Sequence, residues 1–169
     1  MTEQRIAIVT GGGTGVGAAC ATALAAAGWS VAVLGRRPEP LERVAAATDG
    51  VHAFPCDVTD PADVERVFGA VVARFGRLDL LFNNAGRGGS AVPVDEVDVD
   101  EWRQVVDLNV TGTFLCTRAA FGIMRHQDPQ GGRIVNNGSI SAQVPRPGSI
   151  AYTATKHAVT GMTLSLIHI

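Results

Sequence analysis

Five short apolar runs, separated by longer segments with helical periodicity, set the strongest limit on how this chain folds. The runs are rich in Val, Ile and Leu and end in small or turn-forming residues, and they lie at 5–9, 30–35, 51–55, 78–83 and 132–137. The segments between and after them predict helices at 15–28, 39–48, 60–75, 99–126 and 150–166. Runs without polar alternation form strands that are covered on both faces. The pattern therefore predicts a doubly wound parallel α/β sheet with helices on both faces and right-handed crossovers.

Length and composition favour a single folded domain over the whole chain. It has 169 residues, of which 46% are hydrophobic, and its formal net charge is −2. The arginines are scattered and form no basic stripe, so neither nucleic acid nor a membrane surface is an expected partner. No apolar run reaches the roughly 20 residues that span a bilayer. Three widely spaced cysteines and a start without a signal-peptide pattern favour the reducing cytoplasm.

A glycine-rich turn follows the first predicted strand directly and opens the first predicted helix. It reads VTGGGTGVG at 9–17. Glycines at this place let the backbone approach a pyrophosphate, whose charge is stabilised by free N–H groups at the positive end of the helix. The turn therefore predicts dinucleotide binding, and a loop that serves packing alone is the alternative. The candidate cofactor-binding residues here are Thr10, Gly11, Gly13, Thr14, Gly15, Val16 and Gly17.

The end of the second predicted strand favours NADP over NAD. An acidic residue at this place would bind the ribose 2′-hydroxyl, but the chain has Gly35, Arg36 and Arg37 instead. The two forked guanidinium groups suit a 2′-phosphate, although two solvated arginines are the alternative.

The residues after the third predicted strand are candidates for the adenine end of the cofactor. Asp57 is expected either to accept a hydrogen bond from the adenine amino group or to take part in helix capping, and the two roles are equally favoured. Its neighbour Val58 is a further candidate. Thr59 or Asp60 is expected to cap the third helix, with Pro61 in the first turn.

Five motifs occur in an order and spacing that resemble the short-chain dehydrogenase/reductase family. They are TGGGTGVG at 10–17, NNAG at 83–86, LNVTG at 108–112, NNGSIS at 136–141 and YTATK at 152–156. The resemblance covers residues 5 to about 164 and implies a Rossmann-like fold. It also implies that Asn84, Ala85 and Gly86 line the cofactor. The tetrad that does the chemistry in this family would be Asn109, Ser139, Tyr152 and Lys156.

One departure from the family pattern leaves two candidates for the catalytic serine. Gly138 stands where a serine pair is usual, so Ser139 and Ser141 compete for the catalytic role. Ser139 is preferred because it lies at the family's spacing from the tyrosine.

Tyr152 and Lys156 are the only tyrosine and the only lysine of the chain, and their chemistry is complementary. Hydride transfer to a carbonyl carbon leaves charge on the oxygen, which a phenol can neutralise by donating a proton. A phenol ordinarily ionises only near pH 10, and an ammonium nearby favours the phenolate. Residues at i and i+4 share one helix face, so Lys156 can lie beside Tyr152. His157 is one position off this face, and a structural role is expected for it.

The resemblance completes the predicted roles of the tetrad. It implies that Lys156 also binds the nicotinamide ribose and that Asn109 holds water in a relay to the lysine, and a polar residue on a helix face is the alternative for Asn109. Ser139 is expected to polarise the oxygen that Tyr152 protonates.

The sequence thus predicts an NADP-dependent oxidoreductase, with NAD as the alternative cofactor, that interconverts a secondary alcohol and a ketone. A non-catalytic dinucleotide-binding or sensing protein on the same fold is the rival hypothesis. No metal site is predicted. The substrate pocket is expected in part at 87–96 and 142–150, while the acidic run at 95–101 is expected to be a solvated helix N-terminus.

The resemblance also bears on assembly and on the end of the chain. Members of the family are commonly homo-oligomers built through the long helices predicted here at 99–126 and 150–166. They also continue into a further strand, a mobile segment that covers the substrate, and a last strand. The chain is therefore expected to be incomplete at its C-terminus, to lack the last strands, and to end in SLIHI at 165–169 as a non-native continuation. These 169 residues alone are accordingly expected to bind NADP weakly at most.

Overall fold

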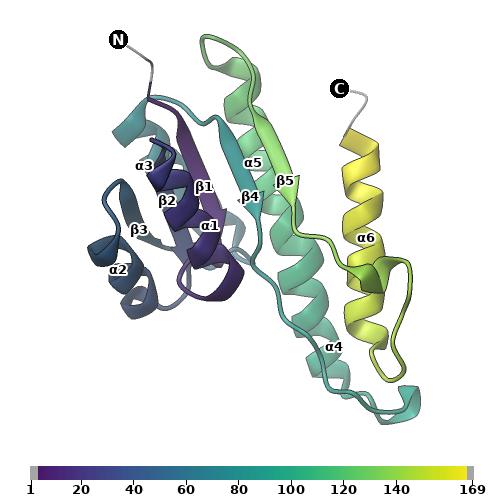
Figure 1. Cartoon of the computed structure of the whole chain (residues 1–169). Coiled ribbons are helices and arrows are strands. Elements are labelled where there is room, and N and C mark those ends of the chain that lie inside the picture. The colour runs from purple at the N-terminus through teal and green to yellow at the C-terminus, as the bar shows by residue number, and fades with distance from the viewer. Residues whose placement is uncertain (1–3, 167–169) are drawn as a thin grey trace.

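A computed structural model describes residues 4–166, which form one parallel sheet with helices on both faces (Figure 1). The strand order is β3-β2-β1-β4-β5, and all four neighbouring pairs are parallel. The predicted doubly wound α/β architecture is thus confirmed. The strands are β1 (Ile6–Thr10), β2 (Ser30–Gly35), β3 (Val51–Pro55), β4 (Leu80–Asn83) and β5 (Arg133–Asn136).

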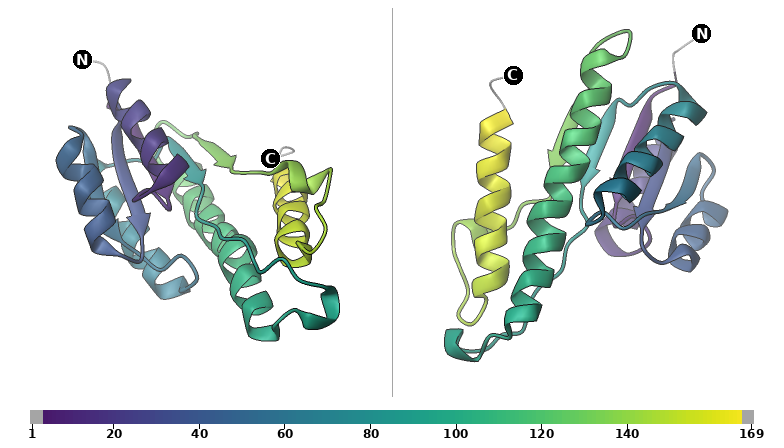
Figure 2. Two further views of the ribbon diagram at one scale, coloured as in Figure 1. Left: turned by 60° about the horizontal axis from the view of Figure 1, so that its bottom comes forward. Right: turned by 180° about the vertical axis from the view of Figure 1, so that it is seen from behind.

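Two groups of helices cover the two faces of the sheet. Figure 2, seen from behind, shows α3, α5 and α6 side by side on one face, while α1 and α2 lie on the other. The helices are α1 (Gly15–Ala26), α2 (Pro38–Ala47), α3 (Pro61–Phe75), α4 (Val99–Val106), α5 (Thr113–His126) and α6 (Ile150–Leu166). Short 3₁₀ turns lie at Val94–Glu96 (η1) and Ile140–Ala142 (η3).

Successive side chains of β1 enter two different hydrophobic cores in turn, and this explains why the run that predicted the strand lacks polar alternation. Ile6 and Ile8 belong to the core beneath α3 and α5, which includes Phe68. Ala7 and Val9 belong to the core on the α1 and α2 side. Both sets are at most 1% exposed. Because each face of the strand packs against a helical layer, a charged side chain on either face would be buried without a partner.

Helix α3 begins and ends as its sequence predicts. The Asp60 side chain accepts a hydrogen bond from the N–H of Ala62, and Pro61 occupies the first turn. At the other end Gly76 adopts a left-handed conformation with φ of 85° and closes the helix.

The helix predicted at 99–126 is instead three consecutive helical segments. Between α4 and α5 lies a π-helical segment, Asp107–Gly112 (η2). A π segment carries hydrogen bonds to the fifth residue along the chain, so it inserts one residue into the helix and changes which side chains face inward. Asn109, in its middle, is only 2% exposed. Gly112 lies so close to the segment after β3 that an added Cβ would be 3.0 Å from Val58 Cγ2.

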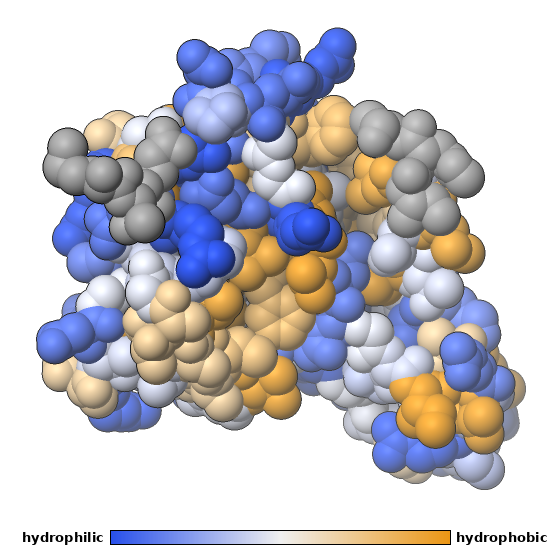
Figure 3. Space-filling model, turned by 45° about the horizontal axis from the view of Figure 1, so that its top comes forward, coloured by the Kyte–Doolittle hydropathy of each residue, from blue (hydrophilic) through white to orange (hydrophobic). Residues whose placement is uncertain are grey.

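At the open edge of the sheet, β5 and α6 lie on either side of a hollow. Its volume is about 960 Å³, and its lining includes Phe121 and Met124 of α5, Ile134 of β5 and Leu166 of α6. Figure 3 shows apolar surface between the sheet and the C-terminal part of the molecule. The expectation about SLIHI falls partly on residues 167–169, which lie outside the described residues. No helix within residues 4–166 is both long and apolar enough to cross a bilayer.

Candidate active site

A cleft of about 450 Å³ lies at the carboxyl edge of the sheet, where parallel strands place their ligand sites. Most of its lining comes from the glycine turn, the end of β2, the segment after β3 and the segment after β4, and residues of α2 and η2 complete it. The cleft thereby brings together nine of the predicted cofactor-binding residues, namely Gly11, Gly13, Thr14, Arg36, Arg37, Asp57, Val58, Ala85 and Gly86.

The geometry of the glycine turn requires glycine at Gly11 and at Gly17. Gly11 has φ of 64°, a conformation that L-residues rarely adopt. A Cβ on Gly17 would lie 2.3 Å from Gly11 O and 2.6 Å from Asn84 Nδ2. The first turn of α1 is thereby held against the turn, with Gly15 and Val16 exposed at the surface. This arrangement fits a pyrophosphate bound at the helix N-terminus.

Thr10 and Asn84 support the cleft from behind and do not line it. Thr10 is 2% exposed, and its Oγ1 accepts hydrogen bonds from the N–H groups of Asn84 and Ala85, each at 3.0 Å. Asn84 Nδ2 in turn donates to Thr10 O at 3.0 Å. These bonds fasten the segment after β4 to the glycine turn.

Arg36 and Arg37 lie at the rim of the cleft with exposed side chains. Within residues 4–166, no hydrogen bond or ion pair engages either guanidinium. The nearby Glu39 pairs with Arg43 instead, one turn along α2. Both groups are therefore available to an anion at the end of β2.

Asp57 lines the cleft and does not cap α3, so the capping alternative is wrong. Its Oδ1 accepts from Thr59 N at 3.0 Å and Thr59 Oγ1 at 2.8 Å, while the cap is Asp60. The N–H of Asp57 donates to Asp63 Oδ2 at 2.7 Å. This bond and the Arg66 guanidinium lower the pKa of the Asp63 carboxyl.

Tyr152 and Lys156 lie on one face of α6, as the four-residue spacing predicts. The Lys156 Nζ lies 5.5 Å from the centre of the Tyr152 ring and donates a hydrogen bond to Asn137 O at 2.6 Å. Lys156 is 8% exposed, whereas Tyr152 is half-buried. A buried cation needs compensating partners. The ring and the carbonyl provide them here.

The two candidate serines have different surroundings. Ser139 is half-buried, and its Oγ accepts the N–H of Ser141 at 3.1 Å. Ser141 is 0% exposed, and its hydroxyl has no hydrogen-bond partner in the described part of the chain. A fully buried hydroxyl cannot reach a substrate, so the structure favours Ser139, which precedes η3 next to α6.

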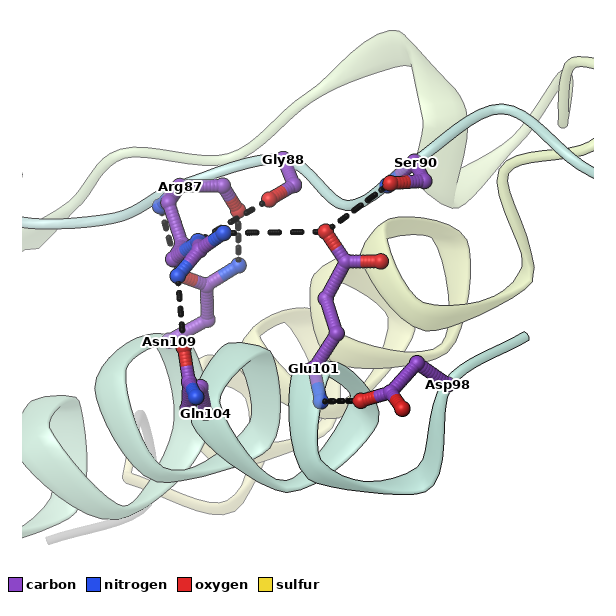
Figure 4. Close-up of polar contacts among 7 residues, drawn as sticks. All are labelled: Arg87, Gly88, Ser90, Asp98, Glu101, Gln104 and Asn109. Atoms are coloured by element: carbon purple, nitrogen blue, oxygen red, sulfur yellow. Dashed lines mark hydrogen bonds and ion pairs between the residues drawn. The ribbon is translucent and has the colours of Figure 1, made fainter.

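Asn109 ties the segment after β4 to the helix that carries Tyr152 and Lys156. Figure 4 shows the first of these contacts, between Asn109 and Arg87. Asn109 Oδ1 accepts the N–H of Arg87 at 2.9 Å, and Asn109 Nδ2 donates to Arg87 O at 2.9 Å and to Thr155 Oγ1 at 3.0 Å. All the polar atoms of its side chain are thus engaged. Its burial excludes an exposed position on the helix surface. Asn109 O accepts from Thr113 Oγ1 at 2.8 Å.

Glu101 has a role that the acidic run at 95–101 did not predict. Asp98 caps α4 by accepting the N–H of Glu101, as expected for a helix N-terminus. The Glu101 carboxylate, however, accepts from both N and Oγ of Ser90 at 3.1 Å and lies 3.6 Å from Arg87 Nη2. Arg87 also donates to Gln104 at 2.9 Å (Figure 4). These contacts hold the loop after β4 on α4.

Three more residues of the site were not predicted from the sequence: Arg87, Thr155 and Asn137. Thr155 and Asn137 stand inside recognised motifs, beside the residues that the motifs single out. The polar pair of Asn136 and Asn137 after the apolar run of a strand was the available signal for Asn137. His157 is exposed, and its Nδ1 lies 2.9 Å from Thr153 O one turn earlier, in keeping with a structural role.

Comparisons with known proteins agree with this geometry. The profile of the family described as short chain dehydrogenase matches residues 5–168. A 2,5-dichloro-2,5-cyclohexadiene-1,4-diol dehydrogenase of Sphingobium indicum is 41% identical over 92% of the chain and 62% of its own length. A 3beta-hydroxysteroid dehydrogenase of Mediterraneibacter gnavus is 37% identical over 95% of the chain and 59% of its own length.

A solved structure shows the same fold. The crystal structure of 3-ketoacyl-(acyl-carrier-protein) reductase from Brucella melitensis, complexed with NADH, superposes with a TM-score of 0.93 at 33% identity. The match covers 98% of this chain and 69% of that one. The chain thus spans about three fifths of the length of the two dehydrogenases.

Proposed function

The chain belongs to the short-chain dehydrogenase family, and on this premise we propose that the protein is an NAD(P)-dependent oxidoreductase. It interconverts a secondary alcohol and a ketone. The observation that carries the proposal is the pairing of Tyr152 with Lys156 on the helix face that meets the carboxyl edge of the sheet. The names of the two dehydrogenases, a diol and a hydroxysteroid enzyme, support a substrate with a hydroxyl group on carbon.

The cleft would hold the cofactor along the carboxyl edge. The glycine turn would bind the pyrophosphate, Asp57 and Val58 would contact the adenine, and Asn84, Ala85 and Gly86 would lie along the path to the nicotinamide. When bound, a nicotinamide cofactor supplies the hydride for reduction and accepts it in oxidation. Arg36 and Arg37 support a preference for NADP, because both guanidinium groups lie at the cleft without an acidic partner in the described part of the chain.

The tetrad residues would divide the proton chemistry among them. Tyr152 gives its phenol proton to the carbonyl oxygen in reduction and takes it back from the alcohol in oxidation. The charge of Lys156 beside the ring favours the phenolate that the oxidation requires. Ser139 keeps its proton and donates a hydrogen bond to the same oxygen, since the N–H of Ser141 already occupies an acceptor site of its Oγ. Asn109 aligns α6 with the segment after β4, and its further role would be to hold the water of a relay to Lys156.

Steady-state assays test the activity directly. Oxidation of NADPH and NADH by the full-length protein should be measured with a panel of ketones, and the reverse reaction with the corresponding alcohols. We expect turnover with at least one pair. Cofactor binding without turnover on any substrate, together with an unchanged cellular phenotype for Tyr152→Phe, would instead identify a dinucleotide-sensing protein.

Equilibrium binding tests the cofactor preference. We expect a lower dissociation constant for NADP than for NAD, and Arg36→Ala should remove most of the difference. Each charge-assisted hydrogen bond to the phosphate contributes about 1.5–3 kcal/mol, which corresponds to at least tenfold in affinity. Tighter binding of NAD by the unchanged protein would overturn the preference for NADP.

We also propose that the protein acts in the cytoplasm as a homo-oligomer. Exposed apolar side chains on the outer face of α4 and α5, including Val99 at 60% and Phe114 at 51%, support assembly through these helices. Light scattering on the full-length protein and on Phe114→Glu tests the assembly, which the charge should disrupt.

A further inference from the structure

Asn137 lies between the lysine of the tetrad and the cofactor turn, and we propose that it is a positioning residue that fixes Lys156 relative to the glycine turn. The inference rests on the proposed catalytic function of Lys156. It concerns a residue that the family motifs do not single out, in the segment after β5.

Three polar groups of Asn137 are engaged with three different residues. Its N–H donates to Asn83 O at 2.9 Å and so extends the pairing of β5 with β4. Its carbonyl oxygen accepts from Lys156 Nζ at 2.6 Å. Its side-chain Nδ2 donates to Asn84 Oδ1 at 3.0 Å. One residue is therefore held from the sheet, from α6 and from the segment after β4.

The surroundings of Asn84 fix the direction of the bond between the two asparagines. Asn84 Nδ2 donates to Thr10 O at 3.0 Å and approaches Gly11 O at 3.4 Å. Both partners are carbonyls, so the amide of Asn84 must present its nitrogen to them and its oxygen to Asn137. Asn137 must then offer a donor. An aspartate or an apolar side chain at this position cannot do so at neutral pH.

Hydrogen bonds therefore run without a break from the lysine to the cofactor turn. They lead from Lys156 to Asn137, on to Asn84 and then to Thr10 and Gly11. This series of hydrogen bonds crosses from α6 over the ends of β5 and β4 to β1. A residue that is bonded through both its side chain and its N–H cannot rotate freely, and its carbonyl keeps the direction that Lys156 needs beside Tyr152. The site is thereby organised before substrate binds.

Lys156 depends on this carbonyl more than a surface lysine would. Its side chain is 8% exposed, and within residues 4–166 none of the ion pairs involves it. The Asn137 carbonyl and the Tyr152 ring are its contacts, at 2.6 Å and 5.5 Å. Without the side-chain bond to Asn84 the carbonyl remains, but Asn137 loses one of its three restraints. Lys156 then samples more positions.

Asn137→Leu tests the proposal, because leucine keeps the shape of asparagine and removes the donor. Since Lys156 is the only lysine of the chain, the acylation rate of its amine can be followed by peptide mapping without substrate or cofactor. We expect faster acylation, a kcat about five- to tenfold lower and a substrate KM within twofold of the unchanged protein, the loss expected for one hydrogen bond. The dissociation constant of NADP should rise about two- to threefold.

Gln130→Leu is the matched control. It removes a side-chain amide that donates to Arg125 O at 3.0 Å, in the loop before β5 and away from the cleft. It should leave the acylation rate and kcat unchanged. If Asn137→Leu does not fold, Asn137→Asp keeps the shape and polarity, faces Asn84 Oδ1 with an acceptor, and should produce the same changes.

The outcomes separate this inference from the proposed function. Unchanged acylation and unchanged kcat in a folded Asn137 variant would overturn the positioning role. Absence of turnover in the unchanged protein would remove the proposed activity but leave the acylation test intact. An equal effect of Gln130→Leu would show a general loss of stability, and the positioning role would again be wrong.

Discussion

Lys156 Nζ lies 5.5 Å from the centre of the Tyr152 ring, one turn along the same face of α6. The two are the only lysine and the only tyrosine among 169 residues, in which thirteen arginines otherwise provide the positive charge. A compact ammonium fits between the ring and the Asn137 carbonyl, where the planar fork of a guanidinium would be too large. The use of a single lysine at this place follows from that geometry.

Tyr152→Phe should abolish turnover while leaving cofactor binding intact. The substitution removes the phenol proton and keeps the ring that packs beside Lys156. General acid–base catalysis contributes about 10²- to 10⁴-fold, so kcat should fall by at least a factor of about 100. Steady-state kinetics and NADP titration check both halves of the prediction. A kcat within tenfold of the unchanged protein would exclude Tyr152 as the acid.

Lys156→Arg should also lower kcat strongly, although it conserves the positive charge. The guanidinium cannot occupy the position of the ammonium beside the Asn137 carbonyl without displacing α6 or the ring. We expect kcat at least tenfold lower, since each 1.36 kcal/mol of lost transition-state stabilisation is a factor of ten. Full activity in Lys156→Arg would show that charge alone is sufficient.

The sequence of each segment predicted the strands and helices that depend mainly on residues within that segment. The strands in the middle of the sheet follow from uninterrupted apolar runs, because helices cover both of their faces. At the edge, β5 leaves Val135 46% exposed. The helical segment at 107–112 could not be foreseen. DLNVTG has an ordinary helical pattern, and its π geometry accompanies contacts with distant residues, such as Asn109 with Arg87 and Gly112 with Val58.

The same division applies to the site. Motif spacing identified Tyr152 and Lys156, which act through their side chains on one helix. Glu101 and Asn137 act on segments far from them in the sequence, through bonds to Ser90 and to Asn84. The sequence pattern of a single segment does not predict hydrogen-bond partners in another segment.

Gly17→Ala should damage the cofactor turn. The new Cβ would lie 2.3 Å from Gly11 O, which is backbone and cannot move aside without opening the turn. We expect a loss of about 1–3 kcal/mol in the free energy of unfolding, together with a loss of NADP affinity. Gly69→Ala is the matched control. Nothing lies within 4 Å of its Cβ position on the exposed side of α3, so alanine should stabilise the protein by about 1 kcal/mol.

The three thiols should differ in reactivity. Burial, with the Asp63 carboxylate adding to it, raises the pKa of the Cys56 thiol to about 12, and burial raises the pKa of Cys116 well above its usual range. Cys20 is partly exposed on α1. Alkylation of the folded protein near neutral pH should therefore label Cys20 at least about tenfold faster than the other two. Mass spectrometry of quenched samples measures this, and rapid labelling of Cys56 would contradict it.

Asp63→Asn should lower the free energy of unfolding at neutral pH but not in acid. The N–H of Asp57 and then the Arg66 guanidinium hold the pKa of the Asp63 carboxyl below its ordinary value of 3.8. A carboxyl with a lowered folded pKa contributes stability that is present above the ordinary value. This contribution is lost as the pH falls through the lower folded value, because the unfolded chain binds the proton more readily.

Urea unfolding of Asp63→Asn and of the unchanged protein at a series of pH values measures the effect. The difference in free energy of unfolding should be constant near neutrality and should shrink below about pH 4. Because Asp63 also holds the peptide of Asp57 at the rim of the cleft, the affinity for NADP should fall in parallel at neutral pH. Asp49→Asn removes the same charge from an exposed residue outside the cleft and should change neither quantity. A difference between Asp63→Asn and the unchanged protein that stays the same into acid would show that the lowered pKa of Asp63 does not stabilise the fold.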